Sequence, residues 1–541
     1  MRKSIFVIGI LSLPSFQLAG QDISGQKLDL ERNYQAQLPE STKRGVTPIL
    51  PPIDTSTRLQ DYSVPAQVAK VPHAPPQLKP LGLKAAPKEK QYNGHLKAGG
   101  GVPSAILGNL GYSYVGDAFQ ASLWAEHHQA SSQAIENQSF QQTKVRLNGT
   151  AEINEGHALE SKIGYGRNRV HFYGYDHEQF QFEADRIRQQ FQTIDVSTKL
   201  YNKERTDADL NYYISPAYYH LKDAYGNSEN GLKLELGGDK WFAEKHVFRM
   251  LVNTDFTTFQ DVEKQHLNNI YLQPSFTFHT DFLKLKLGGN FVSNRDIFHI
   301  YPDAELSLRV VGDGIQLFAL ANGDLRKNTF RTMSTYNPFL EIRSNNATLR
   351  NTDYRNYAAG IKGSASWINY SLQGGFAQAN NLALYQTRFT KVDNQEVTRF
   401  EVLYDTVKMV QFQGSLQLTP IKNLVISGLL SQRFFTSTQQ EKAWGIPGLE
   451  GTFTGEYRVL DGKAGLKASC FIADKISRLD ATGLAGADGV LVDFSVGGNY
   501  RLGKYFGVFL DINNLFNNQR ERWHNYPIFG TNIMAGVTAR F

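Results

Sequence analysis

The sequence predicts an all-β protein, in which a large antiparallel transmembrane β-barrel follows a disordered, proline-rich N-terminal tail. Apolar and polar residues alternate with a period of two from about residue 93 to the last residue. Tight turns alternate along the chain with long polar connections. The final stretch is an amphipathic strand that ends in Phe541. Together these three observations favour a membrane barrel over a water-soluble sandwich.

The composition excludes a helical membrane protein. Hydrophobic residues make up 41% of the 541 residues, and the mean hydropathy is −0.39. Beyond residues 1–20, no apolar run reaches the roughly 18 residues that a transmembrane helix needs. A barrel keeps a low mean hydropathy because only alternate residues of each strand face lipid. The net charge of +6 and the absence of a long basic block give no support to nucleic-acid binding.

Residues 1–20 have the organisation of a secretory signal peptide. A basic start, Arg2-Lys3, precedes an apolar stretch that runs to Leu13, and small residues occupy positions 19 and 20. The next residue is Gln21, where lipidation would require a cysteine. We therefore expect an exported chain without a lipid anchor.

Residues 21–92 are predicted to form an extended periplasmic tail. They hold 10 of the 19 prolines and show no sustained period of two or of 3.6. Such a segment buries too little apolar surface to offset its conformational entropy. Two interpretations stay open: a passive spacer, or a tether that docks on a periplasmic or outer-membrane partner protein. In the second case, residues 46–53 or 62–68 are the candidate contacts.

Residues 93–541 are predicted to form the barrel. In the stretch 492–502, apolar residues or glycine occupy every second position, and Asp493, Asn499 and Arg501 lie among the residues between them. We expect the apolar set to face lipid and the polar set to face the lumen. The single cysteine, Cys470, falls on the apolar face of a similar strand. We interpret it as a small lipid-facing side chain.

The spacing of the connections supports a membrane barrel. Tight turns are predicted at 154–156, 366–367, 420–423 and 503–504, and long polar connections at 173–186, 326–353, 436–451 and 517–530. Outer-membrane barrels have short periplasmic turns and long extracellular loops. At about 20–25 residues for each strand with its connection, the domain holds on the order of 18 to 22 strands.

The last strand is predicted to close the barrel. Counting back from the chain end, one face carries Ile533, Ala535, Val537, Ala539 and Phe541. An amphipathic strand that ends in phenylalanine resembles the signal by which barrel-assembly machinery recognises its substrates. A closing strand must pair with the first one so that no open edge faces lipid.

The stretch 500–541 resembles the C-terminal end of TonB-dependent receptors, particularly those of the Bacteroidota. The matching residues run from Val508 to Asn517 (VFLDINNLFN) and continue with Trp523, Tyr526-Pro527, Gly530, Gly536 and Phe541. The resemblance implies a penultimate strand, a last extracellular loop and the closing strand. Within it, we interpret Asn513-Asn514 as a strand-ending turn. The proline-rich tail, residues 98–101 and residues 171–175 more loosely resemble a group of plug-less, receptor-like barrels.

The resemblance implies a receptor-like pore in the cell outer membrane that is involved in transport. The sequence departs from that family because a folded plug should precede the barrel, and only residues 21–92 are available. No convincing TonB-binding box stands out. We therefore predict a pore without its own plug, in contact with outer-membrane lipid and the barrel-assembly machinery. The alternative is a non-transporting barrel component or scaffold of an envelope assembly or secretion complex.

The sequence predicts no enzyme, catalytic residue, cofactor or metal site. His127-His128 and His171 belong to no recognisable motif, and we interpret them as surface or girdle residues. Asp207-Ala208-Asp209 begins like a calcium loop, but the ligands and the glycine that should follow are missing. We interpret this segment as a solvated turn.

Overall fold

The computed structural model describes residues 92–295, 297–342 and 349–541. The predicted signal peptide and proline-rich tail therefore lie outside the described residues. Within those ranges, no helix is both long enough and apolar enough to cross a membrane.

The described chain consists almost entirely of β-strands, because β-branched and aromatic residues alternate with polar ones through most of it. The barrel strands are β1 (Gly94–Val102), β2 (Ala105–Val115), β3 (Phe119–Ser131), β4 (Ser139–Asn154), β5 (His157–His171), β6 (Arg188–Asn202), β7 (Leu210–Lys222), β8 (Ser228–Phe242), β9 (His246–Gln260), β10 (Lys264–His279), β11 (Leu283–Asn294), β12 (Ile297–Val311), β13 (Ile315–Asn328), β14 (Arg350–Ala365), β15 (Ile368–Val392), β16 (Gln395–Leu418), β17 (Leu424–Ser437), β18 (Leu449–Val459), β19 (Ala464–Ala473), β22 (Leu491–Arg501), β23 (Phe506–Asn513) and β26 (Asn532–Arg540). The connections contain two small hairpins, β20 (Ser477–Leu479) with β21 (Ala485–Ala487) and β24 (Glu521–Trp523) with β25 (Tyr526–Pro527), and two short helices, η1 (Ala184–Ile187) and α2 (Phe330–Tyr336).

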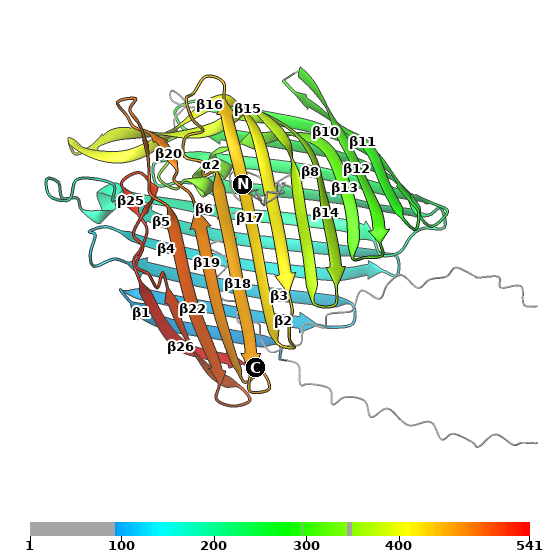
Figure 1. Cartoon of the computed structure of the whole chain (residues 1–541), viewed down its shortest axis with the longest axis horizontal. Coiled ribbons are helices and arrows are strands. Elements are labelled where there is room, and N and C mark those ends of the chain that lie inside the picture. Colours follow the sequence, from blue (N-terminus) through cyan, green and yellow to red (C-terminus); the bar gives the residue numbers. More distant parts are fainter. Residues whose placement is uncertain (1–91, 296, 343–348) are drawn as a thin grey trace, which may run out of the picture. The chain divides into compact units, whose positions relative to one another are not determined.

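The barrel is a single closed antiparallel sheet of 22 strands (Figure 1). The first strand closes the ring by pairing with the last, in a register that runs from His95↔Arg540 to Val102↔Ile533. Closure satisfies the backbone groups of both strands, as the hydrocarbon region of a membrane demands. The predicted fold class is confirmed, and the strand number lies at the upper end of the expected range.

Side chains alternate between the outer face and the lumen. On β26, Ile533 and Val537 are 45% and 55% exposed, whereas Met534 is 3% exposed and packs against Phe509 inside the barrel. Cys470 pairs with Phe453 on one side and Phe494 on the other, which places it on the outer face as predicted. The outer face is therefore apolar, and the chain is a transmembrane barrel.

The connections differ in length between the two ends of the barrel. At one end, called the turn end, the longest connection is 203–209. At the other, called the loop end, the long connections are 172–187, 329–349, 438–448, 474–490 and 514–531. The four predicted turns are confirmed. Because outer-membrane barrels keep short turns in the periplasm, the loop end faces the exterior.

The predicted connection 326–353 is wrong in its extent and content. Strand β13 continues to Asn328, β14 starts at Arg350, and α2 lies between them. The helix starts with reciprocal caps: the Thr332 backbone N–H donates to Thr329 Oγ1, and the Thr329 backbone N–H donates to Thr332 Oγ1. A helix of seven residues is too short to leave a period of 3.6 in the sequence.

Strands β15 and β16 are much longer than a membrane crossing requires. They have 25 and 24 residues, whereas about 9–11 tilted residues span the bilayer. Their pairing continues past the bulge at 379–382 to Val392↔Gln395. The yellow tip of this hairpin extends beside the cyan loops in Figure 1. The alternation predicts these strands but not their projection beyond the membrane.

Candidate functional site

Loops from distant parts of the sequence pack into one hydrophobic core at the loop end. We call this assembly the cap; it consists of loops 172–187, 329–342 and 514–531 with the loop-end parts of β15 and β16. Its buried side chains include Phe172, Met333, Leu340, Phe400, Trp523 and Tyr526. The same core includes Val170 of β5 and Val397 of β16. These strands are eleven positions apart (16 − 5 = 11) in a ring of 22, so the cap joins opposite walls of the barrel.

Aromatic rings form the centre of the cap. The Tyr526 ring stacks on Phe339 with centroids 3.7 Å apart and meets the edge of Tyr173 at 4.9 Å. Tyr173 also donates its hydroxyl to the Pro527 carbonyl, at 3.0 Å. A Cβ atom at Gly174 would lie 2.7 Å from the Tyr526 ring, so only glycine permits this approach. Each such ring pair contributes about 0.5–1.5 kcal/mol beyond the burial of apolar surface.

Arg399 of β16 connects four segments of the loop end. It is 4% exposed, and its Nη1 lies 3.5 Å from Glu341 Oε1 in loop 329–342. The guanidinium lies over the rings of Phe172 and Tyr225, 4.2 and 4.9 Å from their centroids. It also donates to the Tyr225 hydroxyl at 3.3 Å. A buried charge is tolerated here because an opposite charge and two ring faces surround it.

The tip of the β15–β16 hairpin is fastened to loop 172–187. Arg186 Nε donates to Asp393 Oδ2 at 2.9 Å, and its Nη2 lies 2.5 Å from Asp393 Oδ1. These hydrogen bonds hold the pKa of Asp393 below its ordinary value. Further along the hairpin, the Thr398 backbone N–H donates to the Gly174 carbonyl at 2.8 Å. The hairpin therefore bridges to the opposite side of the mouth.

Helix α2 anchors loop 329–342 to the inner wall. The Glu229 carboxylate, fully buried on β8, accepts hydrogen bonds from the backbone N–H groups of Phe330 and Arg331, at 2.6 and 3.1 Å. A carboxylate beside the first turn of a helix also satisfies its unpaired N–H groups. Arg331 Nη1 lies 2.6 Å from Asp195 Oδ1, in the middle of β6. The loop therefore enters the lumen below the rim.

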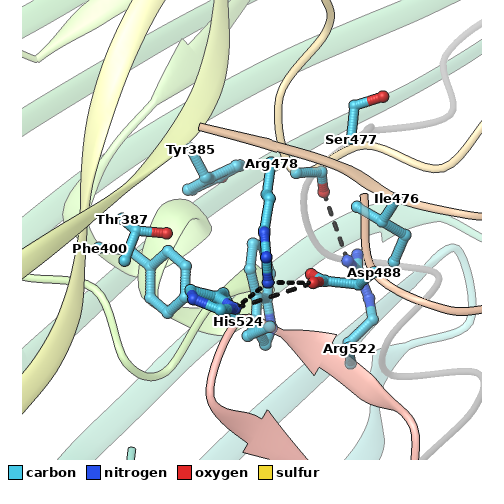
Figure 2. Close-up of a pocket in the computed structure, with 11 residues that line it drawn as sticks. Tyr385, Thr387, Phe400, Ile476, Ser477, Arg478, Asp488, Arg522 and His524 are labelled. Carbon is cyan, nitrogen blue, oxygen red and sulfur yellow. Dashed lines mark hydrogen bonds and ion pairs between the residues drawn. The ribbon is translucent and has the colours of Figure 1, made fainter. Parts of the chain in front are cut away.

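A small cavity lies beside the cap (Figure 2). Tyr385, Phe400, Arg478, Asp488 and His524 are among its lining residues. Its volume is ≈ 10 Å³, which is about the smallest that can hold one water molecule. It is too small to be a binding site for a transported solute.

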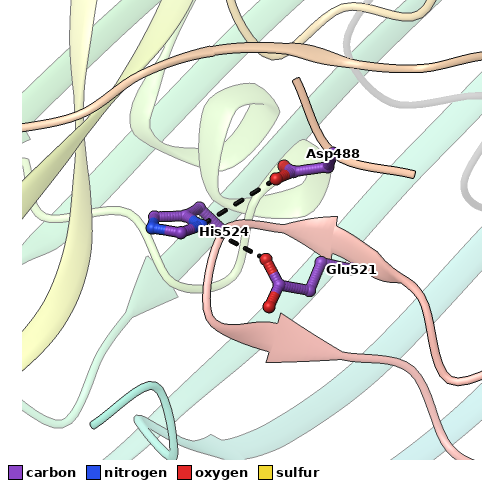
Figure 3. Close-up of side chains that lie close together, drawn as sticks. All are labelled: Asp488, Glu521 and His524. Atoms are coloured by element: carbon purple, nitrogen blue, oxygen red, sulfur yellow. Dashed lines mark hydrogen bonds and ion pairs between the residues drawn. The ribbon is translucent and has the colours of Figure 1, made fainter. Parts of the chain in front are cut away.

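Three side chains at this cavity resemble a metal-binding set. One ligand atom each from Asp488, Glu521 and His524 lie within 4.8 Å of one another (Figure 3). However, Arg478 Nη1 donates to Asp488 Oδ1 at 3.0 Å and also contacts His524 Nδ1. This guanidinium already provides a positive charge at those atoms. Burial raises the pKa of Asp488, whereas hydrogen bonds from His524 and Asn525 lower the pKa of Glu521 against the effect of its own burial. We interpret the cluster as a polar link between the two small hairpins.

Four residues of the predicted closing signal lie on β26, and the fifth, Phe541, directly follows this strand. Ile533, Ala535, Val537 and Ala539 pair with Val102, Gly100, Ala98 and Leu96 of β1, respectively. Phe541 completes the closure, because its backbone N–H and C=O both bond to Gly94, at 3.0 and 2.8 Å. Recognition of this strand by assembly machinery stays a prediction.

The other residues singled out in the sequence have local partners. His127 lies 2.9 Å from the Thr143 hydroxyl, and His171 lies 2.8 Å from the Ser139 hydroxyl. Asn514 ends β23 with a φ of 47° and donates its amide to the carbonyls of Asn518 and Phe529, both at 2.8 Å. The predicted strand-ending turn is confirmed. Residues 207–209 lie in the connection 203–209, as the solvated-turn interpretation predicts.

Solved structures with a similar fold are described as a transporter and as receptors. The FrpB iron transporter from Neisseria meningitidis (F5-1 variant) matches with a TM-score of 0.65 at 10% identity, over 84% of this chain and 83% of that one. The ferric-catecholate import receptor Fiu from E. coli K12 matches with a TM-score of 0.62 at 9% identity, over 83% and 82%. The siderophore receptor PiuA from Acinetobacter baumannii matches with a TM-score of 0.62 at 11% identity, over 84% and 82%. Neither a protein-family model nor a curated protein matches the chain.

At these identities the similarity is one of fold. A closed 22-strand barrel with an apolar outer face is a structure of outer membranes, and this chain is an outer-membrane β-barrel with a receptor-like architecture. The predicted receptor-like barrel is confirmed at that level. The resemblance to receptors of one particular phylum stays a prediction.

Proposed function

We propose that the protein is a receptor-like pore involved in transport across the outer membrane, without a plug domain of its own. The observation that carries the proposal is the cap, which packs across the mouth of the barrel. A 22-strand barrel encloses a lumen wide enough to leak unless something fills or covers it. A cap built from the barrel's own loops meets that need and can also contact an incoming solute.

The fold comparisons support transport as the activity. The similar structures are described as an iron transporter, a ferric-catecholate import receptor and a siderophore receptor. Their ligands belong to those proteins, and for this chain we propose only the transport of a solute. Up to 83% of each of these three chains is matched, so each has a portion without a counterpart here.

The tail is proposed to be a tether. Residues 21–92 are the chain that precedes the barrel, and an extended polyproline segment covers about 3.1 Å per residue. Such a segment can reach a periplasmic partner that supplies a plug or energy. The alternative function, a scaffold of an envelope assembly or secretion complex, uses the same tether but needs no passage through the lumen.

The test compares the full chain with a variant that lacks residues 21–92. Pull-downs from solubilised outer membranes identify partners, and proteoliposomes that contain each purified protein measure the flux of small solutes. A third protein, Arg399→Ala, loosens the cap. The transport proposal expects loss of a partner on truncation and increased solute flux through Arg399→Ala. A barrel that passes no solute with the cap open, while the truncated form loses its partner, supports the scaffold instead. Heat-modifiable migration in gels confirms that the truncated barrel is folded.

A further inference from the structure

The outer face of β4 to β7 changes from apolar to basic at one level along the strands. Leu147 of β4, Ile163 of β5 and Val196 of β6 lie side by side and are 45%, 50% and 41% exposed. The next row toward the loop end contains Tyr165 and Ile194, which are also exposed. These rows have the composition of a lipid-facing band that ends in an aromatic girdle.

The two rows above Tyr165 are polar and basic. In the first row, Thr143, Arg167, Gln192 and Lys222 are cross-strand neighbours from β4 to β7. In the second row, Gln141, Arg169 and Gln190 are neighbours in the same way. Alternation along each strand places both rows on the same outer face as Tyr165. The boundary between the bilayer core and the outer headgroup region therefore lies between Tyr165 and Arg167.

Two guanidinium groups converge within this patch. Arg167 donates through Nε and Nη2 to Gln190 Oε1, at 2.9 and 2.7 Å. Arg169 donates to the same oxygen, at 3.3 Å from both Nε and Nη2. One neutral oxygen thus holds two cations side by side, while each guanidinium has five N–H donors. Arg188 adjoins the patch on β6 and pairs with Asp185 of loop 172–187.

In another sector of the barrel, at β11 and β12, the described residues do not show this arrangement. On β11 and β12, Phe291 and Ile300 are neighbours, and Phe298 lies beyond them toward the loop end. Ile300 and Phe298 are 68% and 79% exposed. The exposed side chains near the loop end of β12 are thus apolar, in contrast to the basic patch around Arg167 and Arg169.

We propose that Arg167 and Arg169 bind the phosphorylated headgroup of an outer-leaflet lipid. Planar guanidinium forks match the geometry of phosphate oxygens, and two adjacent forks match a dianionic group. The exposed apolar row directly below accepts the acyl chains of the same molecule. A soluble anion would contact only the two polar and basic rows. A protein partner would not require a basic patch that begins where the apolar band ends. This inference does not depend on whether the barrel transports a solute.

The proposal is tested by lipid titration of the purified full-length protein, read by native mass spectrometry. The probes are diphosphorylated lipid A, the same glycolipid with both phosphates removed, and sodium phosphate. The wild-type protein should bind the phosphorylated lipid about tenfold or more tightly than the dephosphorylated one. The variant R167Q/R169Q should lose this preference. The control R146Q/K162Q removes two positive charges from the luminal face of β4 and β5 and should keep the preference.

Further variants and probes decide how the result is interpreted. R167K/R169K keeps the charge but removes the planar forks, so an intermediate preference is expected; it also replaces R167Q/R169Q if that variant does not fold. Equal binding of the two lipids by the wild-type protein would overturn the proposal. Undiminished preference in R167Q/R169Q would do the same. Displacement of the lipid by sodium phosphate at equal concentration would identify an ion site instead of a lipid site.

Discussion

Replacement of Arg399 by alanine tests whether the cap is a locked element. The Arg399 and Glu341 side chains are 5% and 6% exposed, and removal of one partner from a buried ion pair costs about 3–5 kcal/mol. Glu341 keeps a hydrogen bond from Thr390 at 2.8 Å and a second arginine, Arg388, at 4.0 Å. We therefore expect the free energy that favours the closed cap over the opened cap to fall by about 3 kcal/mol, the lower limit of that range. That loss raises the population of the opened cap about 100-fold.

Hydrogen exchange of the folded protein measures this change. Amides in loops 172–187 and 329–342, and the Thr398 N–H that bonds to Gly174, should exchange about 100-fold faster in Arg399→Ala. Amides of the barrel strands should keep their rates, because the ladder of backbone bonds is untouched. The control is Arg388→Ala, a substitution on the same hairpin at a side chain that is 39% exposed, with an expected cost of about 0–1 kcal/mol. Unchanged exchange in the cap of Arg399→Ala, or equal acceleration in the strands, would refute the reasoning.

Three further predictions follow from the barrel and the hairpin tip. Cysteines introduced in place of Asp493 and Phe494 should react with a water-soluble and a lipid-soluble probe, respectively; equal water accessibility at both would contradict the assigned faces. Val537→Asp places a charge on the lipid face of the closing strand; it should cost less than the about 2–4 kcal/mol of a basic residue at the bilayer midplane and should lower surface levels, whereas normal heat-modifiable migration would contradict this. The bonds from Arg186 lower the pKa of Asp393, so their stabilisation is present above the ordinary aspartate pKa and is lost as the pH falls through the lowered value. Spin-label distances across the hairpin tip should therefore stay constant from about pH 5 to 8 and lengthen below about pH 4, and Asp393→Asn should remove this dependence.

The barrel could be predicted from the sequence because its signals are local. Alternation along a strand and a tight turn both involve residues that are close in sequence, and a membrane supplies the second environment that makes alternation informative. The pairing of Gly94 with Phe541 was also predictable, because a closed barrel requires its first and last strands to meet. The projection of β15 and β16 was not, since alternation does not reveal where the bilayer ends.

The cap could not be predicted because its contacts join segments that are far apart in sequence. Arg186 and Asp393 are 207 residues apart, and Tyr173 meets Pro527 across 354 residues. In the sequence these residues occur in polar connections without a period, as residues of any exposed loop do. The resemblance to known receptors drew attention to residues 171–175 but gave no reason to expect a partner for them. Arg399 lies on an ordinary alternating strand, and nothing nearby indicates its burial.

Ion flow through the lumen can be blocked by the cap, by the tail or by both. A cap and a tail that both obstructed one lumen would act as resistances in series, so removing either one alone would leave conductance low. If only the tail obstructs, deletion of residues 21–92 alone should give the full conductance. If only the cap obstructs, Arg399→Ala alone should raise the conductance, and tail deletion should add nothing. Because the cap is packed between opposite walls, we predict that only the cap obstructs the lumen. Planar-bilayer conductance of the full chain, the two single variants and the combined variant distinguishes the three cases, and a high conductance in the tail-deleted form alone would contradict the prediction.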